Sequence, residues 1–167
     1  TASINAAPVT PGAPVVGAIT QPTCSLATGS VSLSGLPAGN WTLTRNPGGV
    51  TSTGNTTSTS VSGLAAGSYT WTVSNGTCSS IASTSATINA APVTPSAPAL
   101  GAITQPTCSS ATGSVVLNSL PAGNWTIMPG NVTGSTASTT ISGLAAGSYT
   151  WTVSNGSCSS VASASAT

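Results

Sequence analysis

The sequence predicts an all-β protein made of tandem antiparallel Ig-like β-sandwiches joined by short Pro-rich linkers. Three observations predict this fold class. Long motifs occur once in each half of the chain, namely TQPTC, LPAGNWT and SGLAAGSYTWTVSNG. Apolar residues alternate with Ser and Thr in short runs, which is the period-two pattern of half-buried strands. Gly, Pro and Asn interrupt these runs about every ten residues, and no stretch has helical periodicity.

The motif spacing defines the repeats. Ile4 pairs with Ile88 at an offset of 84 residues, whereas Trp71 pairs with Trp151 at an offset of 80. Four residues are therefore missing from the second copy. We expect residues 1–7 to be the last strand of a preceding repeat, residues 8–91 to form one Ig-like repeat with its Pro-rich lead-in, and residues 92–167 to form the next. This pattern is typical of a window in a longer array.

Each strand of a repeat is predicted from its own pattern. Alternation predicts strands over residues 30–36, 41–44, 61–64 and 67–73, and a final strand from Cys78 through Ile81 to Ile88. The polar stretch 48–60 is expected to be a surface loop or an edge region that contains the length difference between the copies. The entry Leu-Ala-Ala-Gly-Ser-Tyr before Trp71 resembles a tyrosine corner, in which a Tyr hydroxyl bonds back to the chain. Asn75-Gly76 predicts a hairpin turn.

Composition excludes most chemistry. The chain has no Asp, Glu or His, and Arg45 carries its only side-chain charge. General acid–base catalysis and calcium, magnesium or hydrolytic zinc sites use carboxylate, imidazole or amine groups that are absent here. One Arg cannot neutralise a nucleic-acid backbone. No run of 18 apolar residues occurs, so this segment is not expected to contact a membrane. We expect no enzyme activity and no cofactor.

The four cysteines lie at equivalent places, two in each copy. This pattern predicts one disulfide per repeat, Cys24 with Cys78 and Cys108 with Cys158. Disulfides indicate an oxidising compartment, so we expect the protein to be extracellular or at the cell surface. Two alternatives stay open: four buried free thiols, and pairing between repeats, such as Cys78 with Cys108.

Prolines repeat at a spacing of three before each copy, at Pro8, Pro11 and Pro14 and again at Pro92, Pro95 and Pro98. Polyproline II has three residues per turn, so these segments are predicted to be semi-rigid spacers. The alternative is that a proline simply begins the first strand of each sandwich.

Six aromatic side chains could form either a sugar-stacking platform or the core. Their strand parity groups them with Leu43 and Val73, so core packing is predicted for all of them: Trp41, Tyr69, Trp71, Trp125, Tyr149 and Trp151.

The ordered motifs Pro-Thr-Cys-x-x-Ala-Thr-Gly-Ser-Val at Pro22 to Val31, LPAGNWT, SGLAAGSYTWTVSNGxC and INAAPV cover nearly the whole chain. This set resembles the repeats of giant surface adhesins of the Bacteroidetes, including SprB-type gliding adhesins. The resemblance implies Ig-like repeats, export by the type IX pathway, and a long surface filament that carries a tip or binds a surface. The chain departs from many such repeats in having no acidic residue, so calcium binding and acid-flanked O-glycosylation motifs are not carried over.

These observations favour a structural function in cell adhesion. The chain is interpreted as a Ser/Thr-rich stalk or filament segment of a long repetitive extracellular adhesin that presents a distal adhesive region and supports attachment or gliding. Its expected partners are neighbouring repeats and other copies of the filament. One alternative is a carbohydrate-binding module array of a secreted protein. Another is a self-assembling fibre or sheath in which the segment from Thr1 to Ile4 completes a neighbouring unit by strand donation.

Overall fold

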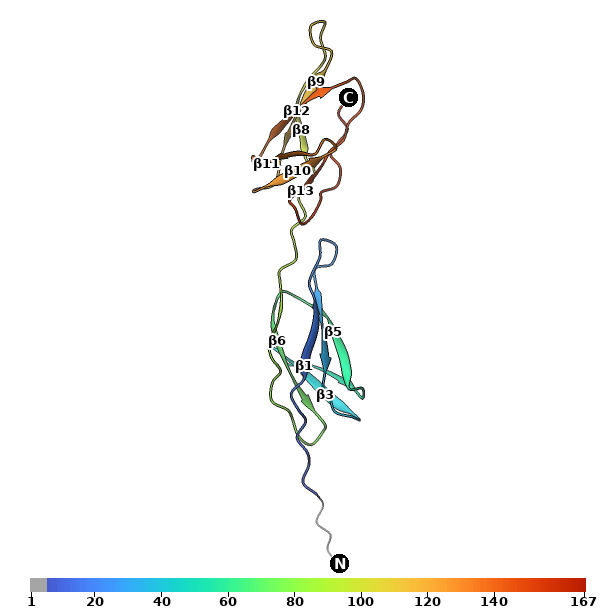
Figure 1. Cartoon of the computed structure of the whole chain (residues 1–167), viewed down its shortest axis with the longest axis vertical. Coiled ribbons are helices and arrows are strands. Elements are labelled where there is room, and N and C mark those ends of the chain that lie inside the picture. Colours follow the sequence, from blue (N-terminus) through green and yellow to red (C-terminus); the bar gives the residue numbers. More distant parts are fainter. Residues whose placement is uncertain (1–5) are drawn as a thin grey trace, which may run out of the picture. The chain divides into compact units, whose positions relative to one another are not determined.

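The structure is a computed structural model of the chain, and it describes residues 6–167 (Figure 1). The chain divides into two compact units, Thr1–Ala91 and Pro92–Thr167. Regular secondary structure in the described residues consists of strands, and every strand pairing is antiparallel. The predicted all-β antiparallel class is therefore confirmed. Residues 1–5 of the predicted strand 1–7 lie outside the described residues, so that assignment stays a prediction.

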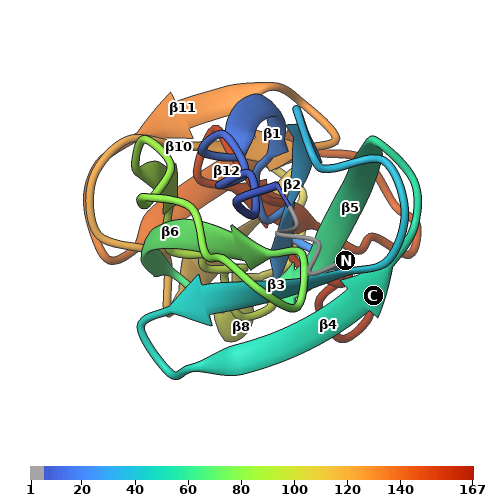
Figure 2. The same ribbon diagram turned by 90° about the horizontal axis from the view of Figure 1, so that it is seen from below.

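The first unit consists of two sheets with the strand orders β1-β2-β5 and β4-β3-β6-β7. Figure 2 shows β3 running between β4 and β6. Buried side chains from both sheets form one cluster, which makes the unit a β-sandwich. Its strands are β1 (Val15–Thr20), β2 (Gly29–Ser34), β3 (Trp41–Asn46), β4 (Val50–Gly54), β5 (Ser58–Leu64), β6 (Gly67–Ser74) and β7 (Ala86–Ile88).

The second unit has the same plan, with sheets β12-β9-β8 and β11-β10-β13. Its buried side chains form a separate core cluster. Tyr149 makes only an isolated bridge with Ala166, where the first unit has an extended pairing of β6 with β7. Its strands are β8 (Ala99–Thr104), β9 (Gly113–Asn118), β10 (Trp125–Met128), β11 (Val132–Gly134), β12 (Thr139–Leu144) and β13 (Thr152–Ser154).

The core follows from strand alternation. On β6, Tyr69, Trp71 and Val73 are buried, and the threonines between them are only half buried. Val31 and Leu33 on β2 join the same cluster from the opposite sheet. Burying a large apolar side chain stabilises the fold by about 1.5–3 kcal/mol, so each unit depends on a few such residues.

The length difference between the units lies in one hairpin. β3 and β4 have six and five residues, whereas β10 and β11 have four and three. Both hairpins pair a Trp with a Gly, Trp41 with Gly54 and Trp125 with Gly134. Two residues are thus absent from each strand, which keeps every remaining side chain on its own face because the side-chain period is two. The stretch 48–60 contains the edge strand β4 and the start of β5, so it is an edge region and not a loop. The prediction that it contains the whole length difference is half right, because two of the four residues belong to β4 and the other two belong to β3.

The segment before β7 does not form the predicted strand. Regular pairing covers only Ala86–Ile88 of the expected 78–88. Ser80, Ser83 and Ala86 are buried, and the two residues between each of them are exposed, including Ile81 at 79%. The segment therefore has a period of three, which is the period of polyproline II, instead of the period of two that a strand requires.

Serine hydroxyls complete the pairing of this segment with β6. The N–H groups of Ser80 and Ser83 donate to the carbonyls of Val73 and Trp71 at 2.8 Å. In return the N–H groups of Val73 and Trp71 donate to the Oγ atoms of Ser80 and Ser83, at 2.9 and 3.0 Å. Two side-chain acceptors thus replace the carbonyls of an ordinary ladder.

The second unit repeats these hydroxyl bonds. The N–H groups of Val153 and Trp151 donate to the Oγ atoms of Ser160 and Ser163, again at 2.9 and 3.0 Å. Ser160 and Ser163 are also buried. The arrangement is therefore part of the repeat and is not a local irregularity of the first unit.

Each Pro-rich lead-in is extended, without strand pairing, up to the first strand of its unit. Burial increases along it, and the last prolines, Pro14 and Pro98, are buried directly before β1 and β8. The lead-in is held to the unit that follows it, because the Nδ2 atoms of Asn75 and Asn155 donate to the carbonyls of Val9 and Val93, at 2.9 and 2.8 Å.

Candidate functional site

The aromatic side chains do not form an exposed platform. Trp71 and Trp151 are 0% and 1% exposed, and Trp41, Tyr69 and Trp125 are buried as well. Tyr149 is partly buried against the second core. The indole N–H groups of Trp41 and Trp125 each donate to a backbone carbonyl at 2.8 Å, that of Thr56 and that of Thr136. The five buried rings therefore support the cores and offer no open face for stacking on a sugar.

Both tyrosines form the tyrosine corner that the sequence predicts. The Tyr69 hydroxyl donates to the Ala65 carbonyl, and the Tyr149 hydroxyl donates to the Ala145 carbonyl, both at 3.0 Å. In the first unit Arg45 lies over the Tyr69 ring, 5.3 Å from its centroid. The only charged side chain of the protein thus packs on a structural aromatic residue.

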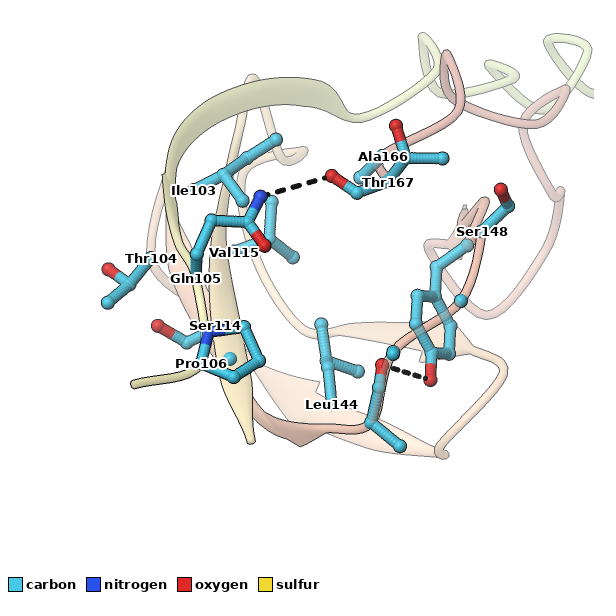
Figure 3. A pocket seen from close by; sticks show the side chains of 15 residues that line it. Ile103, Thr104, Gln105, Pro106, Ser114, Val115, Leu144, Ser148, Ala166 and Thr167 are labelled. Atoms are coloured by element: carbon cyan, nitrogen blue, oxygen red, sulfur yellow. Dashed lines mark hydrogen bonds between the residues drawn. The ribbon is translucent and has the colours of Figure 1, made fainter. Parts of the chain in front are cut away.

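An apolar socket of about 330 Å³ opens beside the corner of the second unit. Figure 3 shows Pro106, Val115 and Leu144 around it, with the Gln105 amide donating to the Thr167 carbonyl at 3.2 Å. Gly113 and Gly147 also contribute to the wall. None of the lining side chains is charged, and most are apolar or small, so the socket is suited to holding an apolar side chain.

The first unit shows what fits such a socket. Ile88, on β7, is 2% exposed and pairs with Gly67, the counterpart of Gly147. A Cβ atom at Gly29, the counterpart of Gly113, would lie 3.0 Å from the Ile88 side chain. Ile88 itself has no counterpart among the 167 residues, because Thr167 corresponds to Thr87.

Burial of the surrounding residues follows the presence of this isoleucine. Leu64 is fully buried in the first unit, whereas its counterpart Leu144 is only partly buried. Pro22 is buried, and its counterpart Pro106 is exposed. The socket of the second unit therefore corresponds to the position that the Ile88 side chain occupies in the first unit.

Two kinds of end can be defined in each unit. The entry end contains the lead-in and the turn after the last long strand, held together by Asn75 or Asn155. The exit end contains Gln21 or Gln105 and the last residues of the unit. In the first unit the Gln21 side chain donates to the Thr87 carbonyl at 3.0 Å and accepts from the Asn89 N–H at 2.8 Å.

The cysteines differ in their bonding. Cys24 and Cys158 are disulfide-bonded, whereas Cys78 and Cys108 are free thiols. The predicted pairs, Cys24 with Cys78 and Cys108 with Cys158, are therefore wrong, because each contains one bonded and one free cysteine. The alternative of four free thiols is also wrong, and so is a bond between Cys78 and Cys108, because both of these cysteines are free.

The physical reason is distance along β6. Cys24 follows Gln21 at the exit end, beside Thr87 and the start of β6, whereas Cys78 follows the end of β6 at Ser74. Eight residues of strand span about 24 Å, and a disulfide needs Cα atoms about 4.4–6.8 Å apart. In Figure 1 the loop between β1 and β2 and the turn after β6 lie at opposite ends of the first unit.

The described residues contain neither a cluster of metal-binding side chains nor a long apolar helix. No group of three or more His, Cys, Asp or Glu side chains gathers there as a metal site requires. Residues 6–167 also include no helix with the length and apolar character needed to cross a membrane.

Neither a known family model nor a curated protein matches this chain. Similar solved structures include the human OSCAR ligand-binding domain, with a TM-score of 0.37 and 15% identity over 93% of this chain and 97% of that one. The BSP domain of a biofilm-associated protein gives a TM-score of 0.30 and 18% identity over 92% of this chain and 28% of that one. The FN1–FN3 domains of chicken CNTN1 give 0.34 and 14%, over 93% and 66%. These similarities are low, and no function is transferred from them.

Proposed function

We propose that the chain is a structural segment of the stalk or filament of a long, repetitive extracellular adhesin. The observation that carries the proposal is that two units repeat the same sandwich, each with its own core. The features that the two units share all hold the fold together. They are the tyrosine corner, the segment bonded through its serine hydroxyls (79–85 and 159–165) and the lead-in held by an asparagine side chain. Units of this kind are suited to providing length, in the manner of solenoids and domain arrays.

Two further observations support the extracellular setting. The chain contains disulfide-bonded cysteines, which persist in oxidising compartments. Its sequence motifs resemble those of surface adhesin repeats, which implies that a distal region of a longer protein does the binding. In this function the segment carries no catalytic residue, and its partners are the neighbouring repeats and other copies of the filament.

Electron microscopy of the native protein on its source cells tests this proposal. The eight residues of β6 and the seven residues of a lead-in, 92–98, give an axial repeat on the order of 50 Å for each unit. We expect thin fibres with that repeat, labelled along their length by an antibody against this segment. Compact particles, or labelling confined to a soluble secreted protein of one or two repeats, would contradict the stalk function.

A second candidate function is assembly of separate chains by strand donation, which the match between the first residues of the chain and β7 favours. Residues 2–5 read Ala-Ser-Ile-Asn, closely matching Ala-Thr-Ile-Asn at 86–89, where Ile88 fills the socket of the first unit. Donation of an extended strand to a sheet edge combines main-chain hydrogen bonds with a pocket for one side chain. A second copy of this chain has the matching segment.

A peptide with the sequence of residues 85–91 tests the socket directly. Added to the 167-residue chain, it should cause saturable NMR shifts at Gly113 and Gly147 and none at Gly29 and Gly67. The matched peptide with Ile88→Ser should bind at least ten-fold more weakly, because burying the side chain is worth about 1.5–3 kcal/mol. Equal shifts from the two peptides would reject the socket as an isoleucine site. If only the separate peptide binds and sedimentation shows a monomer, self-assembly by this route is rejected.

A further inference from the structure

We propose that the first unit holds a binding groove for a neutral polysaccharide at its entry end. The groove has a volume of about 550 Å³ and lies entirely within this unit. Its wall is formed by Asn40, Trp41, Thr42, Thr53, Gly54, Asn55, Asn75 and Gly76. The proposal assigns binding to the repeated segment itself, whereas the stalk function needs only its length.

The fold brings three asparagines to this groove from separate parts of the chain. Asn40 directly precedes β3, Asn55 directly follows β4, and Asn75 directly follows β6. Because β3 is antiparallel to both of its neighbours, its start and the ends of β4 and β6 lie at the same end of the sheet. Three primary amides thus surround one hollow, and each amide has both donors and an acceptor.

Two threonine hydroxyls complete the polar wall. Thr42 on β3 lies directly opposite Thr53 on β4, so the two side chains project from the same face of the sheet. In the described part of the chain neither hydroxyl makes a hydrogen bond, and the same is true of the Asn40 and Asn55 amides. The hydrogen-bonding groups of these four side chains are therefore available to a ligand.

Asn75 is instead a fixed part of the wall. Its Nδ2 atom donates to the Val9 carbonyl at 2.9 Å. Its Oδ1 atom accepts from the N–H groups of Thr77 and Cys78, at 3.2 and 2.9 Å. A wall held in this way before the ligand arrives reduces the entropy lost on binding.

The lining selects an uncharged ligand. None of the groove side chains is charged, and the chain contains no acidic residue. Arg45, the only charged side chain, packs over the Tyr69 ring on the core side of β3. An ion in the groove would lose hydration without meeting an opposite charge. Sugar hydroxyls both donate and accept hydrogen bonds, so they match the amides and hydroxyls of the wall.

Hydroxyls continue beyond the groove, which favours a saccharide chain over a single sugar. The next outward side chain on β3 is Thr44, which lies opposite Thr51 on β4 and Thr72 on β6. Side chains two residues apart on a strand are separated by about 6.8 Å. None of these three hydroxyls makes a hydrogen bond within residues 6–167. A polysaccharide that leaves the groove along β3 therefore meets further hydrogen-bonding groups.

The second unit keeps most of this wall. Thr126 again lies opposite Thr133, and only one of the eight lining positions differs, with Ser135 in place of Asn55. Beyond these positions, the next outward side chain on β10 is the exposed Met128 instead of a threonine. We therefore expect the second unit to bind the same ligand more weakly.

An NMR titration of the 167-residue chain tests the proposal. The probes are cellohexaose, mannohexaose and galactohexaose, which present neutral hydroxyls in three different arrangements. At least one should shift the amide signals of Thr42, Thr53 and Asn55 saturably, with a Kd on the order of 1 mM. The corresponding monosaccharide should bind at least about ten-fold more weakly, because it reaches only the groove.

Three outcomes of this titration would overturn the proposal. One is the absence of a saturable shift at these residues with every probe at about 10 mM. Another is an equal response to hexagalacturonate, a charged saccharide of the same length. The third is a set of shifts that follows the protein concentration instead of the sugar concentration, which would assign this face to contact between copies of the chain.

A pair of matched variants locates the site without disturbing the fold. Thr42→Val removes one hydroxyl from the groove and keeps the shape of a side chain that suits a strand, so binding should weaken by about three- to ten-fold. Thr70→Val makes the same change on β6, opposite Asn46 and outside the groove, and should leave the Kd unchanged within about two-fold. Equal Kd values for the two variants would reject the groove.

The result is independent of the fibres observed by microscopy. Fibres from a protein that binds none of the saccharides reject the groove and leave the stalk function in place. Saccharide binding by a protein that forms no fibres rejects the stalk function and leaves the groove in place.

Discussion

Replacing Ser83 with alanine tests whether side-chain hydroxyls hold the segment of period three to the sheet. In the first unit the Ser83 Oγ accepts the N–H of Trp71 at 3.0 Å and donates to the Thr84 carbonyl at 2.8 Å. Ser83 is 7% exposed, and Trp71 is completely buried. Alanine keeps the backbone bond from the Ser83 N–H to the Trp71 carbonyl and removes only the hydroxyl.

The expected loss follows from the N–H group that remains. A buried donor without a partner costs about 1–3 kcal/mol, more than the net value of one hydrogen bond. For a unit of this size, each kcal/mol lowers the melting temperature by about 4–8 °C. We therefore expect Ser83→Ala to reduce the free energy of unfolding of the first unit by about 2 kcal/mol and its melting temperature by about 8–16 °C.

Native-state hydrogen exchange of the tryptophan amides measures each unit separately. In Ser83→Ala, exchange at the Trp71 amide should become about 30-fold faster, whereas the Trp151 amide of the second unit stays nearly unchanged. Ser163→Ala should produce the converse result, because Ser163 accepts the N–H of Trp151 in the same way. The matched control is Ser85→Ala at an exposed position of the same segment, with an expected change within about 0.5 kcal/mol.

Equal stabilities of Ser83→Ala and Ser85→Ala would refute the reasoning. That result would mean that the Trp71 N–H finds another acceptor, such as a water molecule, and that the hydroxyl is not required for the segment to pair with β6.

Three other perturbations address the corner, the packing and the electrostatics. Tyr69→Phe removes the hydroxyl bond to Ala65 and should cost about 1 kcal/mol in urea unfolding, and a cost below 0.3 kcal/mol would show that the corner is closed by ring packing alone. Gly54→Ala places a Cβ against the Trp41 ring, closer than two carbon atoms can approach, and should destabilise the first unit by about 1–3 kcal/mol. The control Gly12→Ala, with nothing within 4 Å, should be neutral or slightly stabilising, and similar melting temperatures for the two variants would contradict this packing. The chain has no Asp, Glu or His, so its free energy of unfolding should be constant between about pH 4 and 7. Calorimetry measures this, and a melting temperature that changes with pH over that range would show that titration of another group is coupled to folding.

The strands and the core could be predicted because they depend on local alternation. Val31 and Leu33, or Trp71 and Val73, share a face whenever their segment is a strand, and no knowledge of the partner strand is needed. The tyrosine corner was predictable for a similar reason, since its donor and acceptor are only four residues apart.

The segment 79–85 was mispredicted because its composition hides its period. Ser, Ala and Thr are small enough to be exposed or buried, so an apolar–polar pattern cannot show which residues face the sheet. The buried residues Ser80, Ser83 and Ala86 occur at every third position, and the same spacing in Ser160, Ser163 and Ala166 is the signal that could have revealed it.

The cysteine pairing and the socket could not be predicted, because both depend on three-dimensional separation. The equal number of cysteines in each repeat suggests pairs within repeats, but the length of β6 prevents Cys24 from reaching Cys78. The socket emerges only when the two units are compared, since the sequence does not show that Ile88 is the side chain that fills it in the first unit.

The serine-bonded segment has a consequence for how this protein avoids aggregation. Most proteins keep the edges of their sheets from pairing with other molecules by placing lysines or other charges there, and this chain has only one charged side chain. Along β6 the edge is covered by a strip with a period of three, whose outward backbone groups are out of step with those of a β-strand. A second strand approaching from outside finds no matching ladder. The β6 edge of this nearly uncharged protein is thus covered through hydroxyl bonds and mismatched backbone geometry instead of electrostatic repulsion.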